Sequence, residues 1–222
     1  MKKGDLVWGL ILVGVVLFVT LPQTKDVFIA FTVKFRYLSS FAKFAVLATM
    51  GELLAIRLKN GNWEKPKGFI SRVIAWGLMG IIVCLVTKIF ADGVMSAQKA
   101  GYLPFYGSRI ISGFLTSFLN NIFFAPVLMA LHRIAHSYIV MKYEEQRKVI
   151  SFKQVIYHVD WKEFVDFVLL KTIPFFWIPA HTITFSLAEN YRVIMAAMLS
   201  VVLGILLSIA NKEKKQELRE CA

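Results

Sequence analysis

Long apolar runs, separated by short polar segments, recur along the whole chain. A membrane-spanning helix needs about 20 mainly apolar residues, because the hydrocarbon core of a bilayer is roughly 30 Å thick. Six runs approach this length: residues 6–21, 38–58, 69–91, 110–131, 164–187 and 191–210. The pattern predicts an all-α, polytopic helical membrane bundle of about six transmembrane helices.

The first run stands apart from the other five. It follows Lys2 and Lys3 and ends at Pro22, a pattern that also fits a secretory signal peptide. No small-x-small cleavage site follows it, so we expect residues 1–22 to be an uncleaved, signal-anchor-like transmembrane helix. A helical membrane domain over residues 38–210 and a charged cytoplasmic tail over 211–222 complete the predicted domain organisation.

Composition supports a membrane protein over a soluble one. Hydrophobic residues make up 57% of the chain and charged residues 18%, against roughly 45–50% and about 25% in soluble domains. The segment from 132 to 163 is the main polar interruption, and it is both basic and rich in aromatic residues. It predicts a helix extension followed by an amphipathic stretch at the membrane interface.

The positions of the charged residues change the interpretation of the net charge of +12. With the N-terminus inside, 17 of the 26 lysine and arginine residues fall in the inner segments, and six fall in the outer loops. The inner segments are residues 1–5, 57–72, 132–163 and 211–222. This asymmetry predicts a multi-pass membrane protein with six passes and both termini in the cytoplasm. The expected partners are the bilayer and its anionic headgroups, not nucleic acid.

The fourth run carries a polar face. Ser108, Ser112, Thr116 and Asn120 recur every four residues, and Gly113, Ser117 and Asn121 form the adjacent row. Residues at this spacing share one side of a helix. One interpretation is close helix packing with hydrogen bonds across the interface. The other is one wall of a hydrated path, since two consecutive amides at mid-depth exceed what packing usually requires.

The fifth run is predicted to be a proline-broken helix. Pro174 and Pro179 each remove a backbone donor and clash with the preceding turn. Lys171, Trp177 and His181 flank or occupy the break. Broken helices recur at transporter binding sites, so this segment is the most informative for function. Whether it spans the bilayer or re-enters it stays open.

Two other sets of ionisable residues lie within or beside the runs. Glu52 is near the inner end of the second run, and Arg57 at i+5 is too far round the helix for an ideal pair. Glu52 is either a snorkelling carboxylate near the headgroups or a pore-facing group that titrates. His132 and His136 have the i, i+4 spacing of a metal pair, but without a third ligand they indicate a surface pair.

The sequence gives no support for enzymatic chemistry. It has no Walker A motif, no GxGxxG after a strand, no GxSxG and no zinc-type cysteine pattern. We therefore expect a protein that is not an enzyme and has neither a cofactor nor a metal site.

Short motifs occur in a fixed order in five segments of the chain. They are Met50-Gly51-Glu52; Gly77, Gly80 and Lys88; Asn120-Asn121-Ile-Phe-Phe-Ala125-Pro126; Trp177, Pro179, Ala180 and Phe185; and Tyr191-Arg192. Through these residues the chain, from about 40 to 210, resembles the Mpv-seventeen / peroxisomal membrane protein family of small organellar membrane proteins. The resemblance implies a pore or channel-like role for small solutes or ions in an inner membrane, and we expect the cell inner (plasma) membrane.

Several positions depart from the family pattern. Asn120 stands in place of the family's acid, Ile178 is interposed between Trp177 and Pro179, and His181 falls where a glutamine is common. The departure at Asn120 means that charge-based gating does not carry over from the family. The first run also lies outside the usual four-helix core of the family.

A weaker resemblance is to the bacterial alanine exporter family. It rests on Phe105-Tyr106-Gly-Ser108-Arg109, Pro126 and Ile194-Met195-Ala196-Ala197, and it covers only the last four runs.

These observations leave three functional hypotheses. The first is channel or pore-like transport of small solutes or ions; the second is a proton-coupled exporter of a small amino acid; the third is a structural or partner-binding membrane protein. A homo-oligomer is an open option for each. The candidate path residues are Glu52, Ser112, Thr116, Asn120, Asn121, Lys171, Trp177, Pro179 and His181.

Overall fold

A computed structural model describes residues 3–189, 191–192, 194–195, 198–199 and 202. Every regular element in this part of the chain is helical. The helical bundle that the hydrophobic pattern predicts is therefore confirmed. Most of the predicted sixth span, 191–210, and the whole charged tail, 211–222, lie outside the described residues.

The N-terminal half contains four helices. They are α1 (Lys3–Thr20), α2 (Pro22–Lys34), α3 (Arg36–Asn60) and α4 (Phe69–Lys99). Helix α2 was not predicted from the sequence, because its polar and charged residues are typical of a loop. Pro22 occupies the first turn of α2, where a missing backbone donor costs no hydrogen bond within the helix.

The C-terminal half contains two longer composite helices and one short helix. The first composite joins α5 (Arg109–Leu119), the π-helical segment η1 (Asn120–Phe124), α6 (Ala125–Ile139) and the π-helical segment η2 (Val140–Glu144). Helix α7 (Phe152–His158) follows. The second composite joins α8 (Trp161–Glu163), the π-helical segment η3 (Phe164–Trp177) and α9 (Ile178–Ser186).

Four helical segments of the described chain are long and apolar enough to cross a membrane. They are Lys3–Thr20, Phe69–Lys99, Arg109–Glu144 and Trp161–Ser186. This supports a transmembrane protein. Helix α3 is long enough to span, but Lys43, Glu52 and Arg57 make it less apolar than the other four. Six spans remain a prediction.

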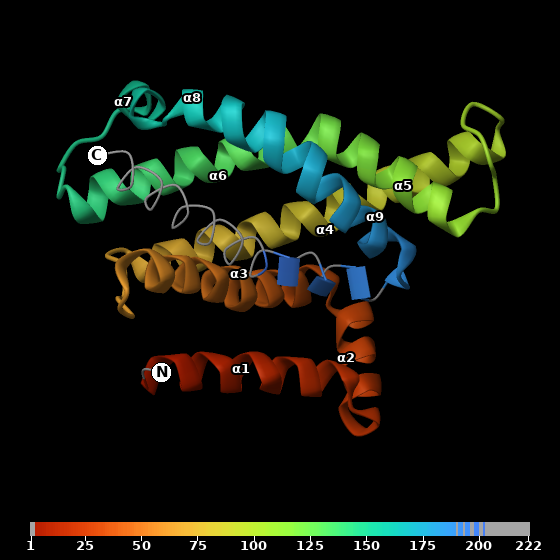
Figure 1. The fold of residues 1–222 in the computed structure, drawn as a ribbon, viewed down its shortest axis with the longest axis horizontal. Helices are drawn as coiled ribbons and strands as arrows, with labels where there is room; N and C mark the ends of the chain where they lie inside the picture. The colour runs from red at the N-terminus through yellow and green to blue at the C-terminus, as the bar shows by residue number, and fades with distance from the viewer. Residues whose placement is uncertain (1–2, 190, 193, 196–197, 200–201, 203–222) are drawn as a thin grey trace, which may run out of the picture.

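The long helices run along a common direction, and α2 lies across one end of them (Figure 1). The N-terminus, the α3–α4 connection and α7 gather at one end of the bundle, whereas α2, the α4–α5 connection and the end of α9 lie at the other. The strongly basic segments predicted to be inside therefore share one end as far as the structure describes them. We call this the basic end.

The fifth run is a continuous helix and not a broken one, so the prediction of a proline break is wrong. The backbone winds as a π-helix over Phe164–Trp177, and the N–H of Ile178 bonds to the carbonyl of Ile173, five residues earlier. Pro174 lies inside this wider winding, and Pro179 falls in the first turn of α9, where its lost donor is tolerated. The wider π turn accommodates a proline that an α-helix would exclude.

Helices α3 and α4 pack closely because two glycines of α4 leave room for α3. A Cβ added at Gly80 would lie 2.5 Å from the backbone oxygen of Ser40, and one at Gly77 would overlap the ring of Phe41. Small residues at such positions let helix backbones approach each other in membranes. The core beside this contact is built from Phe44, Leu47, Ala48 and Val83, together with residues of α1, α2 and Ile194.

This packing gives a test of the α3–α4 contact. We expect Gly80→Ala to lower the free energy of unfolding by about 1–3 kcal/mol, because the added methyl meets a backbone atom that cannot move away cheaply. Gly93→Ala on the same helix is the matched control, since a Cβ there meets nothing within 4 Å. Unfolding by graded SDS in mixed micelles measures both variants, and equal stability of the two would contradict the packing.

Candidate functional site

Two groups of polar side chains lie at contacts between the apolar helices, and two of their members, His136 and Glu144, are exposed. The first, which we call the Arg72 cluster, comprises Glu52, Arg72, Trp76, His132, His136 and Glu144. The second, the Asn121 cluster, comprises Ser117, Asn121 and His181. Polar groups at membrane depth are costly, so they face the bundle interior and mark functional or structural networks.

Arg72 is the centre of its cluster and is only 5% exposed. Its guanidinium pairs with the carboxylate of Glu52 on α3, and it lies 2.7 Å from the carboxylate of Glu144 on η2. Its Nε also donates to the carbonyl oxygen of Lys67 at 3.3 Å. One buried cation therefore joins three helical segments. The planar guanidinium suits this role, because it offers five donors in a fixed arrangement.

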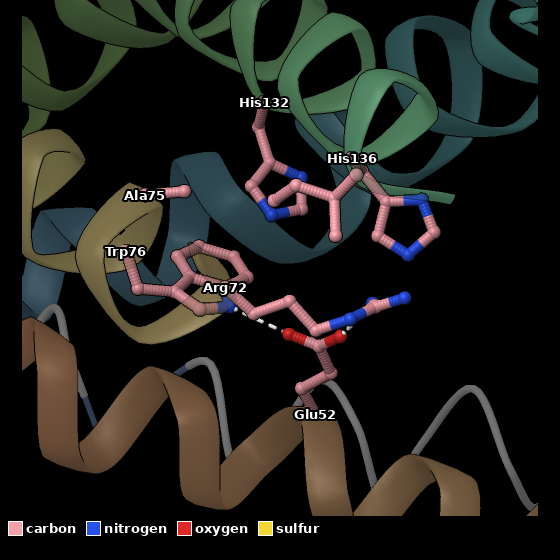
Figure 2. A pocket seen from close by; sticks show the side chains of 7 residues that line it. Glu52, Arg72, Ala75, Trp76, His132 and His136 are labelled. Carbon is pink, nitrogen blue, oxygen red and sulfur yellow. Dashed lines mark hydrogen bonds and ion pairs between the residues drawn. The ribbon is translucent and has the colours of Figure 1, made fainter. Parts of the chain in front are cut away.

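Aromatic and imidazole rings enclose the ion pair on its α6 side. The indole N–H of Trp76, one turn beyond Arg72, donates to the second Glu52 oxygen at 2.8 Å. The ring of His132 lies 4.0 Å from that of Trp76, and His136 follows it along α6. Figure 2 shows Glu52 reaching from α3 toward Arg72 and Trp76 on α4, with both histidines above them on α6. His132 is thus not the surface residue that its spacing indicated.

A small cavity lies within this cluster. Its volume is about 10 Å³, and Ala75 and Ile139 complete its lining. This space holds about one water molecule, which needs two to four polar partners to be stable. The surface of this cavity is almost entirely apolar, so it offers few such partners although charged side chains line it.

The Asn121 cluster connects the first composite helix to α9. The Asn121 side chain is fully buried, and its amide nitrogen donates to the Ser117 carbonyl at 2.8 Å and lies 3.0 Å from Nδ1 of His181. The Ser117 hydroxyl donates to the carbonyl oxygen of Ile178 at 2.7 Å. Nδ1 of His181 also lies 3.3 Å from Oδ1 of Asn121, so the tautomer of the imidazole decides which of the two side chains donates.

Two buried polar atoms beside the Asn121 cluster have no hydrogen-bond partner. They are Oδ1 of Asn120 and the indole nitrogen of Trp177, and both residues are at least nine-tenths buried. Asn120 begins η1, and Trp177 ends η3. A buried polar atom without a partner costs about 1–3 kcal/mol. These two atoms are therefore local costs to stability at the interface between the two composite helices.

The remaining predicted site residues divide into two groups. Thr116 is buried, and Ser112 donates to the side-chain oxygen of Gln98 on α4 at 2.7 Å. Lys171 and Pro179, in contrast, are exposed on the outer side of the second composite helix. The structure brings Ser112, Thr116, Asn120, Asn121, Trp177 and His181 to the helix interfaces, and it places Glu52 in the Arg72 cluster.

Sequence reasoning missed Arg72, Trp76 and Glu144. Arg72 was counted as part of a basic inner segment, although it lies one turn inside α4 and is buried. Its partners are 20 and 72 residues away in the chain. The available signal was the helical spacing of Arg72 and Trp76, which puts both on the face that α3 covers.

Lys88 and Asp92, four residues apart on α4, form an ion pair with a distance of 2.8 Å. Lys88 also lies 3.5 Å from Glu189. These side chains are largely exposed, so the pairs contribute little to stability. They lie at the opposite end of the α3–α4 pair from Arg72.

Among the residues that the structure describes, no three histidine, cysteine or acidic side chains are arranged to hold a metal ion. Comparison with protein-family models, with curated proteins and with solved structures finds no match for this chain.

The Arg72 cluster generates a stability prediction. Arg72→Gln leaves Glu52 without its counter-charge in an apolar surrounding, so we expect a loss of about 3–5 kcal/mol in the free energy of unfolding. Lys88→Gln on the same helix removes an exposed cation and should cost less than about 1 kcal/mol. SDS-titrated unfolding compares the two variants.

A double variant separates the ion pair from other contacts of Arg72. Glu52→Gln combined with Arg72→Gln should recover part of the loss, because the unpaired carboxylate is removed as well. If Arg72→Gln alone is as stable as Lys88→Gln, the cluster does not hold the helices together.

Proposed function

We propose that this chain is an integral membrane protein that provides a channel- or pore-like path for small solutes or ions. The observation that carries the proposal is the set of polar side chains that the Arg109–Glu144 helical segment presents to α4 and α9. Ser112, Asn121 and His132 each contact a polar or aromatic side chain of a neighbouring helix. A helix rises 1.5 Å per residue, so the 20 positions from Ser112 to His132 cover about 30 Å, the thickness of the hydrocarbon core.

The π-helical windings support the same proposal. They are rare and occur frequently at functional sites. Here η1 and η3 carry two of the three buried polar atoms that have no partner among the described residues; the third is Oγ1 of Thr49 on α3. An interface that served packing alone would be more stable if Asn120 Oδ1 and the Trp177 indole nitrogen had hydrogen-bond partners. In a path for water or a polar solute, the same two atoms can form hydrogen bonds with the molecule that passes.

The Arg72 cluster favours a second candidate, a proton-coupled exporter of a small amino acid. A proton added to Glu52 would remove the charge that pairs with Arg72 and would weaken the link between α3 and α4. His132 and His136 lie within the same cluster and could relay that proton. The resemblances to the Mpv-seventeen and alanine exporter families stay predictions that fit the first and second candidates respectively.

Flux through reconstituted liposomes tests the proposal. Enclosed pyranine reports proton movement, and light scattering reports swelling in glycerol, glycine or alanine. We expect the wild-type protein to pass at least one of these probes without a pH gradient. Asn121→Leu should reduce that flux to the level of empty liposomes, because it removes the polar contact to His181 at mid-depth. Phe123→Leu, on the exposed side of the same π-helical segment, should leave it unchanged.

The other outcomes distinguish the alternatives. Flux of alanine or glycine only under a pH gradient, with the gradient dependence lost in Glu52→Gln, would support the exporter in place of the pore. No flux of any probe by well-folded wild-type protein would contradict transport and favour a structural or partner-binding role.

Thiol labelling tests whether water reaches the α9 interface. Thr182 is half-buried and its hydroxyl bonds to the Ile178 carbonyl. In a chain with Cys84 and Cys221 replaced by alanine, Thr182→Cys should react with a charged, membrane-impermeant maleimide added to both sides. Ile183→Cys, on the lipid-facing side, should stay unreacted, and Ser151→Cys in a loop should react fully. Protection of Thr182→Cys equal to that of Ile183→Cys would indicate a dry, packed interface.

A further inference from the structure

A second, larger hollow lies at the basic end of the bundle, outside both polar clusters. It is a groove of about 540 Å³ between α4, α6 with η2, and α7. Its lining residues are Ser71, Ile74, Ala75, Leu78, Ile134, Ala135, Tyr138, Ile139, Lys142, Tyr143, Ile150, Phe152 and Val155. This volume is within the range of ligand sites, roughly 300–1,000 Å³.

The groove is polar at one end and apolar along the rest of its length. Ser71 is the third residue of α4, and Lys142 lies in the last turn of the Arg109–Glu144 segment, so both are at the ends of candidate spans. The Ser71 hydroxyl donates to the Tyr143 hydroxyl at 3.0 Å. Ile74 and Leu78 continue along α4 toward mid-membrane, and Ile134 lies opposite on α6.

This order of residues matches the order of groups in a phospholipid. From Ser71 to Leu78 the helix rises about 10 Å, which is enough to guide the upper part of an acyl chain. The Lys142 ammonium lies over the rings of Tyr138 and Tyr143, at 5.7 and 5.6 Å. None of the lining residues in the described chain is acidic, so no carboxylate of the groove neutralises this cation.

We propose that the groove binds one phospholipid with an anionic headgroup. The phosphate lies against Lys142 and the hydroxyls of Ser71 and Tyr143, and one acyl chain runs along Ile74, Leu78 and Ile134. Basic pockets between transmembrane helices on the cytoplasmic side are suited to such headgroups. The proposal requires the protein to be in a membrane but does not depend on solute transport.

Helix α7 closes the groove on the outer side through Phe152 and Val155. Ser151 and Gln154 form reciprocal hydrogen bonds that fix the start of α7, and His158 at its end lies 3.0 Å from a carboxylate oxygen of Glu145. This hydrogen bond lowers the pKa of the Glu145 carboxyl. Phe152 is 71% exposed, so an acyl chain in the groove would give this aromatic side chain an apolar neighbour.

Native mass spectrometry of the detergent-solubilised protein tests the site. Phosphatidylglycerol and phosphatidylcholine with identical acyl chains are added at equal concentration. We expect one phosphatidylglycerol molecule to be retained preferentially by the wild-type protein. Lys142→Gln should weaken its retention about fivefold, the factor expected from one surface lysine. Lys162→Gln is the matched control, because Lys162 is an exposed cation at the same end but outside the groove.

Variants of the apolar wall test the position of the acyl chain. Leu78→Trp fills the groove without changing its charge and should reduce the retention of both lipids; Ile74→Phe is a milder variant if the first fails to fold, as judged by circular dichroism. Millimolar glycerol 3-phosphate should not displace the bound lipid, because it lacks the chain. Equal loss in Lys142→Gln and Lys162→Gln, unchanged retention in a folded wall variant, or displacement by glycerol 3-phosphate would overturn the proposal.

Discussion

The position of Arg72 constrains the arrangement of helices at the basic end of the bundle. Removing a guanidinium from water costs several kcal/mol unless opposite charges and acceptors surround it. Here those groups come from three different segments: Glu52 on α3, Glu144 on η2 and the backbone of Lys67 before α4. Displacing α3 or η2 would remove one of the two carboxylates that pair with the buried guanidinium. This one cation therefore fixes the register of α3 against α4 and the distance of the first composite helix from both.

In the Asn121 cluster, as around Arg72, buried polar side chains from different helices are hydrogen-bonded to one another. Asn121, Ser117 and His181 satisfy one another across the interface between the two composite helices. The π-helical winding of η1 and η3 alters the spacing of side chains on each helix and so determines which polar atoms meet. Asn120 Oδ1 and the Trp177 indole are left without partners in the process. Two buried polar atoms without partners, which lower the stability, thus lie beside a network whose members are hydrogen-bonded. Such a combination is more typical of functional sites than of interfaces that serve packing alone.

Much of the fold could be predicted because its signal is local. The apolar runs at 69–91 and 110–131 lie within α4 and the first composite helix, and the four-residue spacing from Ser112 to Asn120 identified a buried face. The Arg72 cluster could not be predicted, since its partners are joined by tertiary packing alone. The π-helical winding around Pro174 could not be predicted either, because the rule that proline breaks a helix assumes α-helical geometry.

The proposed lipid groove and the Arg72 cluster are not independent features. Ala75 and Ile139 line both the groove and the small cavity beside Arg72, so these two side chains form the wall between them. Tyr143, at the polar end of the groove, directly precedes Glu144, which pairs with Arg72. The groove and the ion pairs of Arg72 therefore share the C-terminal end of the first composite helix, and a substitution of Ile139 changes the surroundings of both.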